Sequence, residues 1–222
     1  MRIAKAGYPF IIYELIVGIL AFWALQHSRS AAWATIYGAV SGLAFLLAAF
    51  CAYFFRDPKR VVPKGDGLVL SPADGRIVAI EEGRDAAYAE PVWIMRIFLS
   101  VFDPHIQRMP VAGTVRKITY KTGKFLDARH PQAHFENEQN RLEIEPAGRL
   151  KSTPIIVTQI AGLIARRIVC WVSEGQSLET GAQFGLIRFG SQVDVVFPKS
   201  VRFKVKAGDR VEAGSTILAD IP

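Results

Sequence analysis

The stretch AAWATIYGAVSGLAFLLAAFCAYFF, residues 31–55, contains no charged residue. As an α-helix rising about 1.5 Å per residue it would extend about 37 Å, enough to cross a hydrocarbon core of about 30 Å with some tilt. A second apolar run, residues 10–25, precedes it and is interrupted only by Glu14, and residues 26–30 form a short hinge between the two. The sequence therefore predicts an N-terminal apolar helical hairpin over residues 1–55, associated with a membrane.

The charges that flank the two runs predict the orientation of this hairpin. Arg2 and Lys5 precede the first run, and Arg56, Lys59 and Arg60 follow the second. The hinge contains a single basic residue, Arg29. By the positive-inside rule both ends are cytoplasmic, which predicts the cytoplasmic face of the cell membrane. Cys51 and Cys170 are too few for a disulfide framework, in keeping with a reducing compartment.

Three alternatives for the hairpin remain open at this point. The first run is also compatible with a cleaved signal peptide, and both runs with a helical hairpin buried in a soluble protein. A carboxylate in hydrocarbon costs a few kcal/mol, so Glu14 leaves open whether the hairpin spans the bilayer or dips into one leaflet.

Composition narrows the function classes. Of 222 residues, 50% are hydrophobic and 21% charged, which excludes intrinsic disorder, and the net charge of +7 favours an anionic partner. Basic residues of the soluble part are scattered rather than interleaved with aromatic ones, so we expect a lipid surface and no nucleic acid. The four histidines show no recognised ligand spacing. His130 and His134 are four residues apart, but Pro131 between them disfavours the helix that would align their side chains, so we expect no metal site.

From residue 56 onward the pattern is that of short strands. Apolar runs alternate with Pro and Gly at residues 68–70, 77–80, 92–101, 115–120, 154–160 and 193–197. Residues 122–141 read as a long polar loop, and residues 161–171 fit neither helix nor strand well. Residues 206–221 read as turn, strand, turn, strand, which resembles the barrel-sandwich modules of biotinyl and lipoyl domains without their carrier lysine. The predicted fold class is mainly β (α+β): a β-rich, barrel-sandwich-like catalytic domain, 56–222, after the hairpin.

One dipeptide stands out before the last long strand. Arg188-Phe189-Gly190-Ser191 directly precedes the run 192–197, although a Gly-Ser pair by itself is an ordinary turn. Other short motifs accompany it in a fixed order: Phe54-Phe55-Arg56-Asp57-Pro58, Ser71-Pro72-Ala73-Asp74-Gly75, Phe102-Asp103-Pro104-His105, Gly123-Lys124-Phe125, Gln159-Ile160-Ala161-Gly162 and Ala165-Arg166-Arg167-Ile168-Val169. Together these motifs resemble the short, prokaryotic type of phosphatidylserine decarboxylase, from residue 54 to the C-terminus.

The resemblance implies a self-processing enzyme. Members of that family cleave their own backbone at a Gly-Ser bond, here Gly190-Ser191, which would give a large chain 1–190 and a small chain 191–222 that form a heterodimer, with a higher oligomer left open. Ser191 would become an N-terminal pyruvoyl group, the only cofactor. That group forms a Schiff base with phosphatidylserine in the bilayer, and loss of carbon dioxide yields phosphatidylethanolamine.

The resemblance also assigns roles to side chains. Ser191 would attack the Gly190 carbonyl, while Asp74 would orient His105 as the base, in the manner of a hydrolase triad. Arg108 stands where longer members carry a second histidine. The resemblance therefore leaves open whether His105 serves self-cleavage, protonation of the substrate or both. Arg108, Arg166 and Arg167 are candidates to contact the phosphate or carboxylate of the substrate.

Two other functions remain open from the sequence alone. One is a pyruvoyl-dependent decarboxylase of a soluble amino acid, which the apolar hairpin disfavours. The other is a non-catalytic, membrane-tethered binding module, in which Gly190-Ser191 is only a turn.

Overall fold

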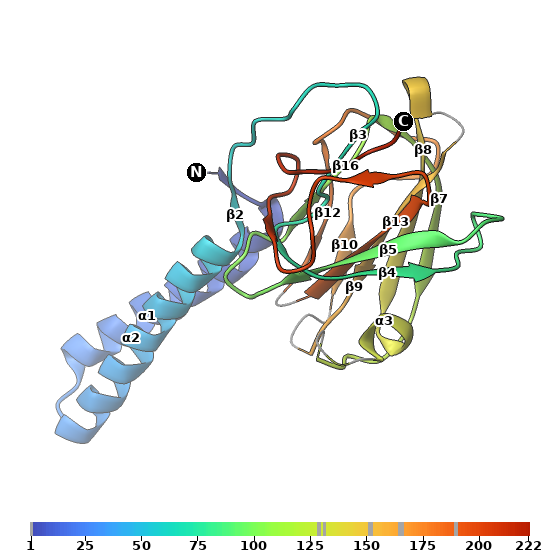
Figure 1. Cartoon of the computed structure of the whole chain (residues 1–222). Helices are drawn as coiled ribbons and strands as arrows, with labels where there is room; N and C mark the ends of the chain where they lie inside the picture. Colours follow the sequence, from blue (N-terminus) through green and yellow to red (C-terminus); the bar gives the residue numbers. More distant parts are fainter. Residues whose placement is uncertain (1, 128–129, 131, 151–152, 164–166, 189–190) are drawn as a thin grey trace. The chain divides into compact units, whose positions relative to one another are not determined.

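The computed structural model describes residues 2–127, 130, 132–150, 153–163, 167–188 and 191–222 (Figure 1). The chain divides into two compact units, Met1–Pro58 and Lys59–Pro222. The first is helical and the second is built almost wholly of strands, so the mainly β fold class with an N-terminal apolar helical pair is confirmed.

The N-terminal unit is an antiparallel helical pair, α1 (Tyr8–His27) and α2 (Ala31–Phe54) (Figure 1). A 3-10 turn, η1 (Lys5–Gly7), precedes α1, and β1 (Arg2–Ile3) pairs with β2 (Arg56–Asp57), which joins the two ends of the hairpin. Both helices are long and apolar enough to cross a membrane.

Small residues form the contact between the two helices. Gly18, Ala21, Ser41 and Ala44 are buried, and Ser41 Oγ donates a hydrogen bond of 3.0 Å to the Gly18 carbonyl. Large side chains point outward instead and are exposed, among them Ile12, Ile16, Ile19, Leu20, Leu43 and Leu46. Close approach at small residues with an apolar exterior is the pattern of membrane helices, and it disfavours the buried hairpin of a soluble protein.

Three sheets make up the second unit. The eight-stranded sheet has the order β11-β7-β8-β9-β13-β5-β4-β15, and the two three-stranded sheets are β10-β12-β6 and β14-β16-β3. The bounds are β3 Leu68–Leu70, β4 Gly75–Gly83, β5 Val92–Leu99, β6 Ile106–Arg108, β7 Gly113–Lys121, β8 Gln139–Pro146, β9 Ile155–Ile160, β10 Ile168–Cys170, β11 Ser177–Leu178, β12 Gln183–Ile187, β13 Ser191–Pro198, β14 Arg202–Phe203, β15 Arg210–Val211 and β16 Ile217–Asp220; the short helices are α3 Ala133–Glu136 and η2 Gly148–Leu150.

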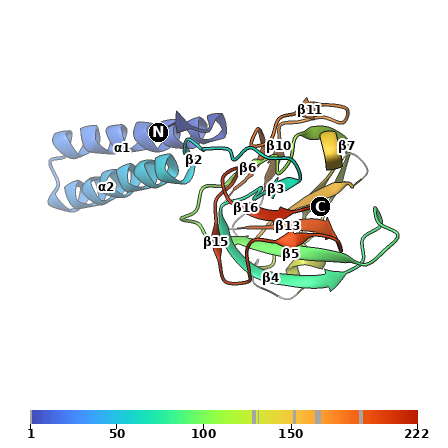
Figure 2. The ribbon, with the colours of Figure 1, turned by 45° about the horizontal axis from the view of Figure 1, so that its top comes forward.

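The strand β13 lies in the middle of the large sheet, between β5 and β9, and Figure 2 shows it beside β5. Its alternate residues Val193, Val195 and Phe197 enter the hydrophobic core, as the two-residue period of a strand requires. The other face carries Gln192 and Asp194. The two faces of this strand therefore have different chemistry.

The structure adds detail in three segments whose sequence pattern was weaker. The turn, strand, turn, strand pattern of residues 206–221 is confirmed by β15 and β16, which belong to different sheets, with positive φ angles of 96° at Gly208 and 70° at Gly214. The polar stretch 122–141 is not loop throughout, because α3 and the start of β8 fall within it. Within 161–171, the described residues form one three-residue strand, β10.

Candidate active site

Ser191 is the first residue of β13, and its side chain lies on the core side of the sheet. It pairs with Leu99 of β5, and the next residue, Gln192, pairs with Ile160 of β9. Ser191 is 0% exposed, and its Oγ has no hydrogen-bond partner among the described residues. A buried hydroxyl left unpaired costs about 1–3 kcal/mol, so this one needs a functional explanation. Gly190, its predicted partner in cleavage, lies outside the described residues.

His105 is buried immediately before β6, and its tautomer follows from one contact. Its Nδ1 lies 2.7 Å from the backbone carbonyl oxygen of Asp103. A carbonyl only accepts hydrogen bonds, so Nδ1 carries a proton. In the neutral ring Nε2 is then the basic nitrogen, which is the arrangement that a general base requires.

Backbone contacts place His105 beside the strand that leads to the predicted cleavage bond. Its carbonyl accepts a hydrogen bond of 3.3 Å from the amide of Ile187, the last residue of β12. The turn before it is fixed by Asp103, whose Oδ2 accepts from the amide and the hydroxyl of Ser100 at 2.9 and 2.7 Å. Since Ser100 follows Leu99, the partner of Ser191, one short turn connects the neighbourhood of Ser191 to His105.

Asp74 lies just before β4, and its partners differ from those of a triad aspartate. Its carboxylate forms an ion pair with Arg60 and accepts a hydrogen bond of 3.4 Å from the amide of Ala213. Burial raises the pKa of Asp74 to about 6, against the opposing effect of Arg60. The Nδ1 partner of His105 is the Asp103 carbonyl, and Asp74 precedes β4, which β5 separates from β13 in the large sheet.

The two candidate arginines that the structure describes, Arg108 and Arg167, have different surroundings. Arg108 ends β6 and donates a hydrogen bond of 3.0 Å to the carbonyl of Gly181, so it holds a neighbouring loop. Arg167 is exposed, and its carbonyl accepts from the amide of Arg188 at 3.2 Å, which places it beside the segment leading to Ser191. Arg166 lies outside the described residues.

A chain of buried amides, which the sequence analysis missed, ends at His105. Asn140 Nδ2 donates to Gln159 Oε1 at 2.8 Å, Gln159 Nε2 donates to Gln107 Oε1 at 2.9 Å, and Gln107 Nε2 donates to the His105 carbonyl at 2.8 Å. The three side chains come from β8, β9 and β6 and are at most 2% exposed. The available signal was Gln159, a polar residue inside the apolar run Ile155–Ile160.

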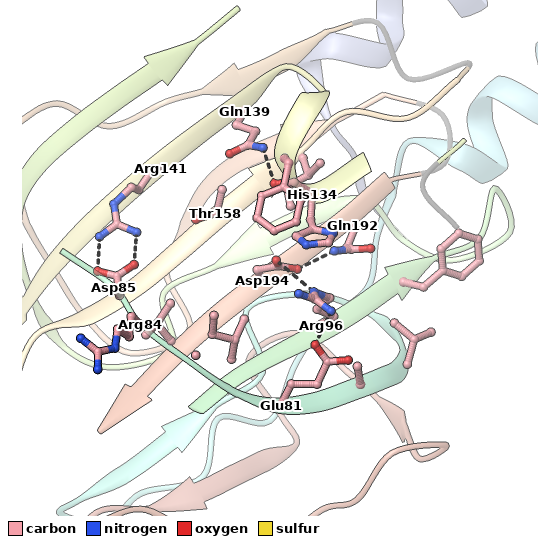
Figure 3. Close-up of a pocket in the computed structure, with 18 of the residues that line it drawn as sticks. Glu81, Arg84, Asp85, Arg96, His134, Gln139, Arg141, Thr158, Gln192 and Asp194 are labelled. Carbon is pink, nitrogen blue, oxygen red and sulfur yellow. Dashed lines mark hydrogen bonds and ion pairs between the residues drawn. The ribbon is translucent and has the colours of Figure 1, made fainter. Parts of the chain in front are cut away.

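The face of the large sheet that carries Gln192 and Asp194 lines a cavity of about 860 Å³ (Figure 3). Gln192 Nε2 donates to Asp194 Oδ1 at 2.7 Å, and Arg96 Nε lies 3.7 Å from Asp194 Oδ2. Burial raises the pKa of Asp194 to about 7, and the hydrogen bond from Gln192 and the charge of Arg96 oppose this shift. Gln192 follows Ser191, but the Ser191 side chain points to the other face, so the cavity lies beside the predicted cleavage bond without containing the hydroxyl.

The sequence analysis also did not identify the residues that line this cavity. Arg141 of β8 donates two hydrogen bonds of 2.7 Å to Asp85. Burial acts to raise the pKa of Asp85, but the hydrogen bonds from Arg141 hold this pKa below its usual value. Asp194 and Arg96 each interrupt an otherwise apolar strand, and such an interruption is the only signal the sequence offered.

Comparison with known proteins gives a consistent result. The family profile described as phosphatidylserine decarboxylase matches residues 47–219. The chain is 44% identical over 216 residues to the phosphatidylserine decarboxylase proenzyme of Magnetococcus marinus, covering 96% of this chain and 93% of the relative. The proenzymes of the same name from Geotalea uraniireducens and Geobacter metallireducens are 42% and 41% identical over 221 and 223 residues, each covering 99% of this chain and 97% of the relative.

Proposed function

Because the chain belongs to the phosphatidylserine decarboxylase family, we propose that it converts phosphatidylserine to phosphatidylethanolamine with a pyruvoyl group made from its own Ser191. The observation that carries this proposal is the Ser191 hydroxyl, buried at the start of a central strand with no hydrogen-bond partner among the described residues. A buried hydroxyl without a hydrogen-bond partner can act as the nucleophile of an intramolecular reaction. Its position in the folded sheet suits a pyruvoyl group that is made from the chain itself.

The first step we propose is attack by Ser191 Oγ on the carbonyl carbon of Gly190. His105 Nε2 takes the hydroxyl proton and returns it to the departing amide nitrogen, so an ester replaces the peptide bond. Asp74, paired with Arg60, acts as a positioning residue through its charge. Glycine at position 190 leaves the carbonyl sterically accessible.

The next steps break the chain and create the new end group. Removal of the Ser191 α-proton expels the Gly190 carboxylate and leaves dehydroalanine at position 191. Its tautomeric imine takes up water and releases ammonia, which leaves a pyruvoyl group. Atoms balance with one water consumed and one ammonia released. The group supplies a ketone that takes up the substrate amine and withdraws electrons from the bond to the leaving carboxylate.

The strand pairing supports a stable complex of the two resulting chains. The small chain, 191–222, would contain β13, and β13 is paired with β5 on one side and with β9 on the other, both from the large chain. The same fragment supplies β14, β15 and β16 to the sheets. A central strand hydrogen-bonded on both edges does not leave without unfolding the sheet, so we expect a tight heterodimer.

The helical unit supports a location at the membrane. A diacyl substrate hardly leaves the bilayer, so the catalytic unit must work at the headgroup plane. The basic residues at both ends of the helical pair support a cytoplasmic location for both ends, and with them for the catalytic unit.

The test is an intact-mass spectrum of the purified protein under denaturing conditions, with Ser191→Ala as the control. We expect two species, residues 1–190 and a fragment 191–222 whose first residue has the mass of a pyruvoyl group, and one uncleaved chain for Ser191→Ala. The two-chain sample should release carbon dioxide from phosphatidylserine and not from free serine. A single unmodified wild-type chain that is nevertheless active would refute the mechanism.

A further inference from the structure

Strand register brings four chain segments together at one end of the large sheet. Ser191 pairs with Leu99, Gln192 pairs with Ile160, and Ile160 also pairs with Gln139. The starts of β13 and β8 and the ends of β5 and β9 therefore lie at the same end of the sheet. Ser191, the first residue of β13, is at that end as well.

Large apolar side chains are exposed at this end, and we call them the docking rim. Phe102 and Leu163 follow Leu99 and Ile160 by three residues each, Phe135 precedes Gln139 by four, and Tyr120 pairs with Asn140. Their exposed fractions are 64% for Phe102, 56% for Leu163, 66% for Phe135 and 54% for Tyr120.

The concentration at one end is the unusual feature. In the described part of residues 59–222, seven large hydrophobic side chains are exposed, and four of them form the docking rim; the others are Val61, Val78 and Trp171. Single exposed apolar residues need no explanation, whereas a group of them gathered around a reactive centre indicates an interaction surface.

Hydrogen bonds join two of the segments that carry the rim. The amide of Ala161 donates to the Glu138 carbonyl at 2.9 Å, and Asn137 Nδ2 donates to the Ala161 carbonyl at 2.8 Å. The segments bearing Phe135 and Leu163 are therefore held against each other.

Charge around the rim favours an anionic surface. Arg76, Arg167 and Arg210 are exposed on the segments beside it, and Arg210 reaches Asp103, in the turn that carries Phe102, at 3.4 Å. The acidic Glu136 is neutralised by Lys124 at 2.7 Å. Exposed aromatic and aliphatic groups next to arginines match the interface of a bilayer, where apolar tips enter and cations meet phosphates.

We infer that the docking rim inserts into the interface of an anionic phospholipid bilayer and brings the Gly190–Ser191 end of the sheet to the headgroup plane. The inference rests on the proposed function, because the substrate of that function is a bilayer lipid. It assigns to the catalytic unit a membrane contact of its own, in addition to the helical pair.

The test places a fluorescent probe on the rim of the full-length protein. Cys51 and Cys170 are replaced by Ala, and the environment-sensitive dye NBD is attached to Phe102→Cys, to Leu163→Cys or to the control Glu90→Cys, all in vesicles of phosphatidylcholine and phosphatidylserine. Glu90 is exposed and lies between β4 and β5, at the opposite end of the sheet. We expect lipid-attached spin labels to quench the probes at 102 and 163 on the order of fivefold more than the probe at 90, with iodide in solution showing the reverse order.

Equal quenching at all three positions would overturn the inference. A spectral change that depends on protein concentration rather than on vesicles would also overturn it and would assign the surface to contacts between copies of the chain.

A second measurement avoids the cysteine changes. The ratio of activity on vesicle phosphatidylserine to activity on monomeric short-chain phosphatidylserine should fall about tenfold in the double variant Phe102→Ser, Leu163→Ser and stay unchanged in Trp171→Ser. An unchanged ratio in the double variant would refute the inference that the docking rim inserts into the bilayer. Failure of the proposed function is distinct, because wild-type protein would then decarboxylate neither substrate while the probes still report contact with lipid.

Discussion

At the scale of single residues, the candidate site depends on two buried groups in defined chemical states. The Ser191 hydroxyl has no partner among the described residues, and the His105 imidazole has its proton fixed on Nδ1 by the Asp103 carbonyl. Neither state is stable in isolation, since a free hydroxyl would be solvated and a free imidazole would exchange tautomers. The surrounding fold stabilises both.

The first prediction concerns His105. Replacing it in His105→Gln removes the basic Nε2, so self-cleavage should slow on the order of 100-fold or more. The measurement is the time course of precursor disappearance on denaturing gels. His27→Gln, which changes a histidine at the end of α1, is the control and should process normally. Normal processing of His105→Gln would move the base to another group.

The second prediction concerns pH and Asp74, whose pKa is raised to about 6 by burial. If the charge of Asp74 supports cleavage, the processing rate should rise as pH passes through about 6 and fall below it, because the carboxylate is present only above that value. The rate is measured on freshly made precursor from pH 4.5 to 8. Asp74→Asn should be slow and should lack this step; a step that persists in Asp74→Asn would assign it to another group.

The raised pKa of Asp74 also determines how this carboxyl group changes the free energy of unfolding with pH. Because the folded pKa lies above the value of 3.8 in the unfolded chain, the folded state holds the proton more tightly. The contribution of Asp74 to the free energy of unfolding is therefore highest below about pH 4 and falls as pH rises through about 6.

At the scale of secondary-structure elements, the amide chain from Asn140 to His105 fastens three strands of two different sheets to one another. Asn140 donates the first bond, and Gln159 and Gln107 each accept one bond and donate the next, so loss of any one amide leaves buried polar groups of its neighbours without partners. Such a network fixes the position of β6, and with it the backbone of His105.

The third prediction tests this network with Gln107→Met, which keeps the length of the side chain and removes its polar atoms. We expect a loss of about 1–3 kcal/mol in the free energy of unfolding for the orphaned partners, together with slower self-cleavage. Thermal unfolding and the gel time course measure the two effects. The matched control is Gln176→Met, at an exposed position in a turn. Lower stability with an unchanged cleavage rate would show that the network serves the fold and does not position His105.

At the scale of the whole molecule, the candidate site and the membrane-length helices belong to different units. Every described residue of the candidate site lies in Lys59–Pro222, and both membrane-length helices lie in Met1–Pro58. The small chain formed by cleavage would remain part of the same sheet through both edges of β13.

The fourth prediction separates the two units. Deleting residues 1–58 should convert a protein that resists extraction from membranes by alkaline carbonate into one that the same treatment releases, because the lipid-length helices are gone. Self-cleavage should persist, since its residues remain. Fractionation followed by denaturing gels shows both results, with the full-length chain as the control. A truncated protein that still resisted carbonate would shift stable anchoring to the catalytic unit.

The local pattern of the sequence was enough to determine the element types of the apolar runs, but not those of residues 122–141 and 161–171. An uncharged run of helix length, residues 31–55, can satisfy its backbone in lipid only as a helix, and short apolar runs broken by Pro and Gly become strands. The family also followed from the sequence, because its motifs are contiguous and each needs no tertiary information to be recognised.

Only the tertiary structure decided which groups meet. The partner of His105 Nδ1 is a backbone carbonyl, and no residue type reports the direction of a carbonyl. Asp74 binds Arg60, and the three amides come from strands far apart in the sequence. Which face of β13 carries the Ser191 hydroxyl, and which exposed apolar residues gather at its end, depends on strand register, since a shift of one residue would reverse every side chain. The sequence by itself thus determined the elements and the family, and long-range pairing decided the geometry of the site.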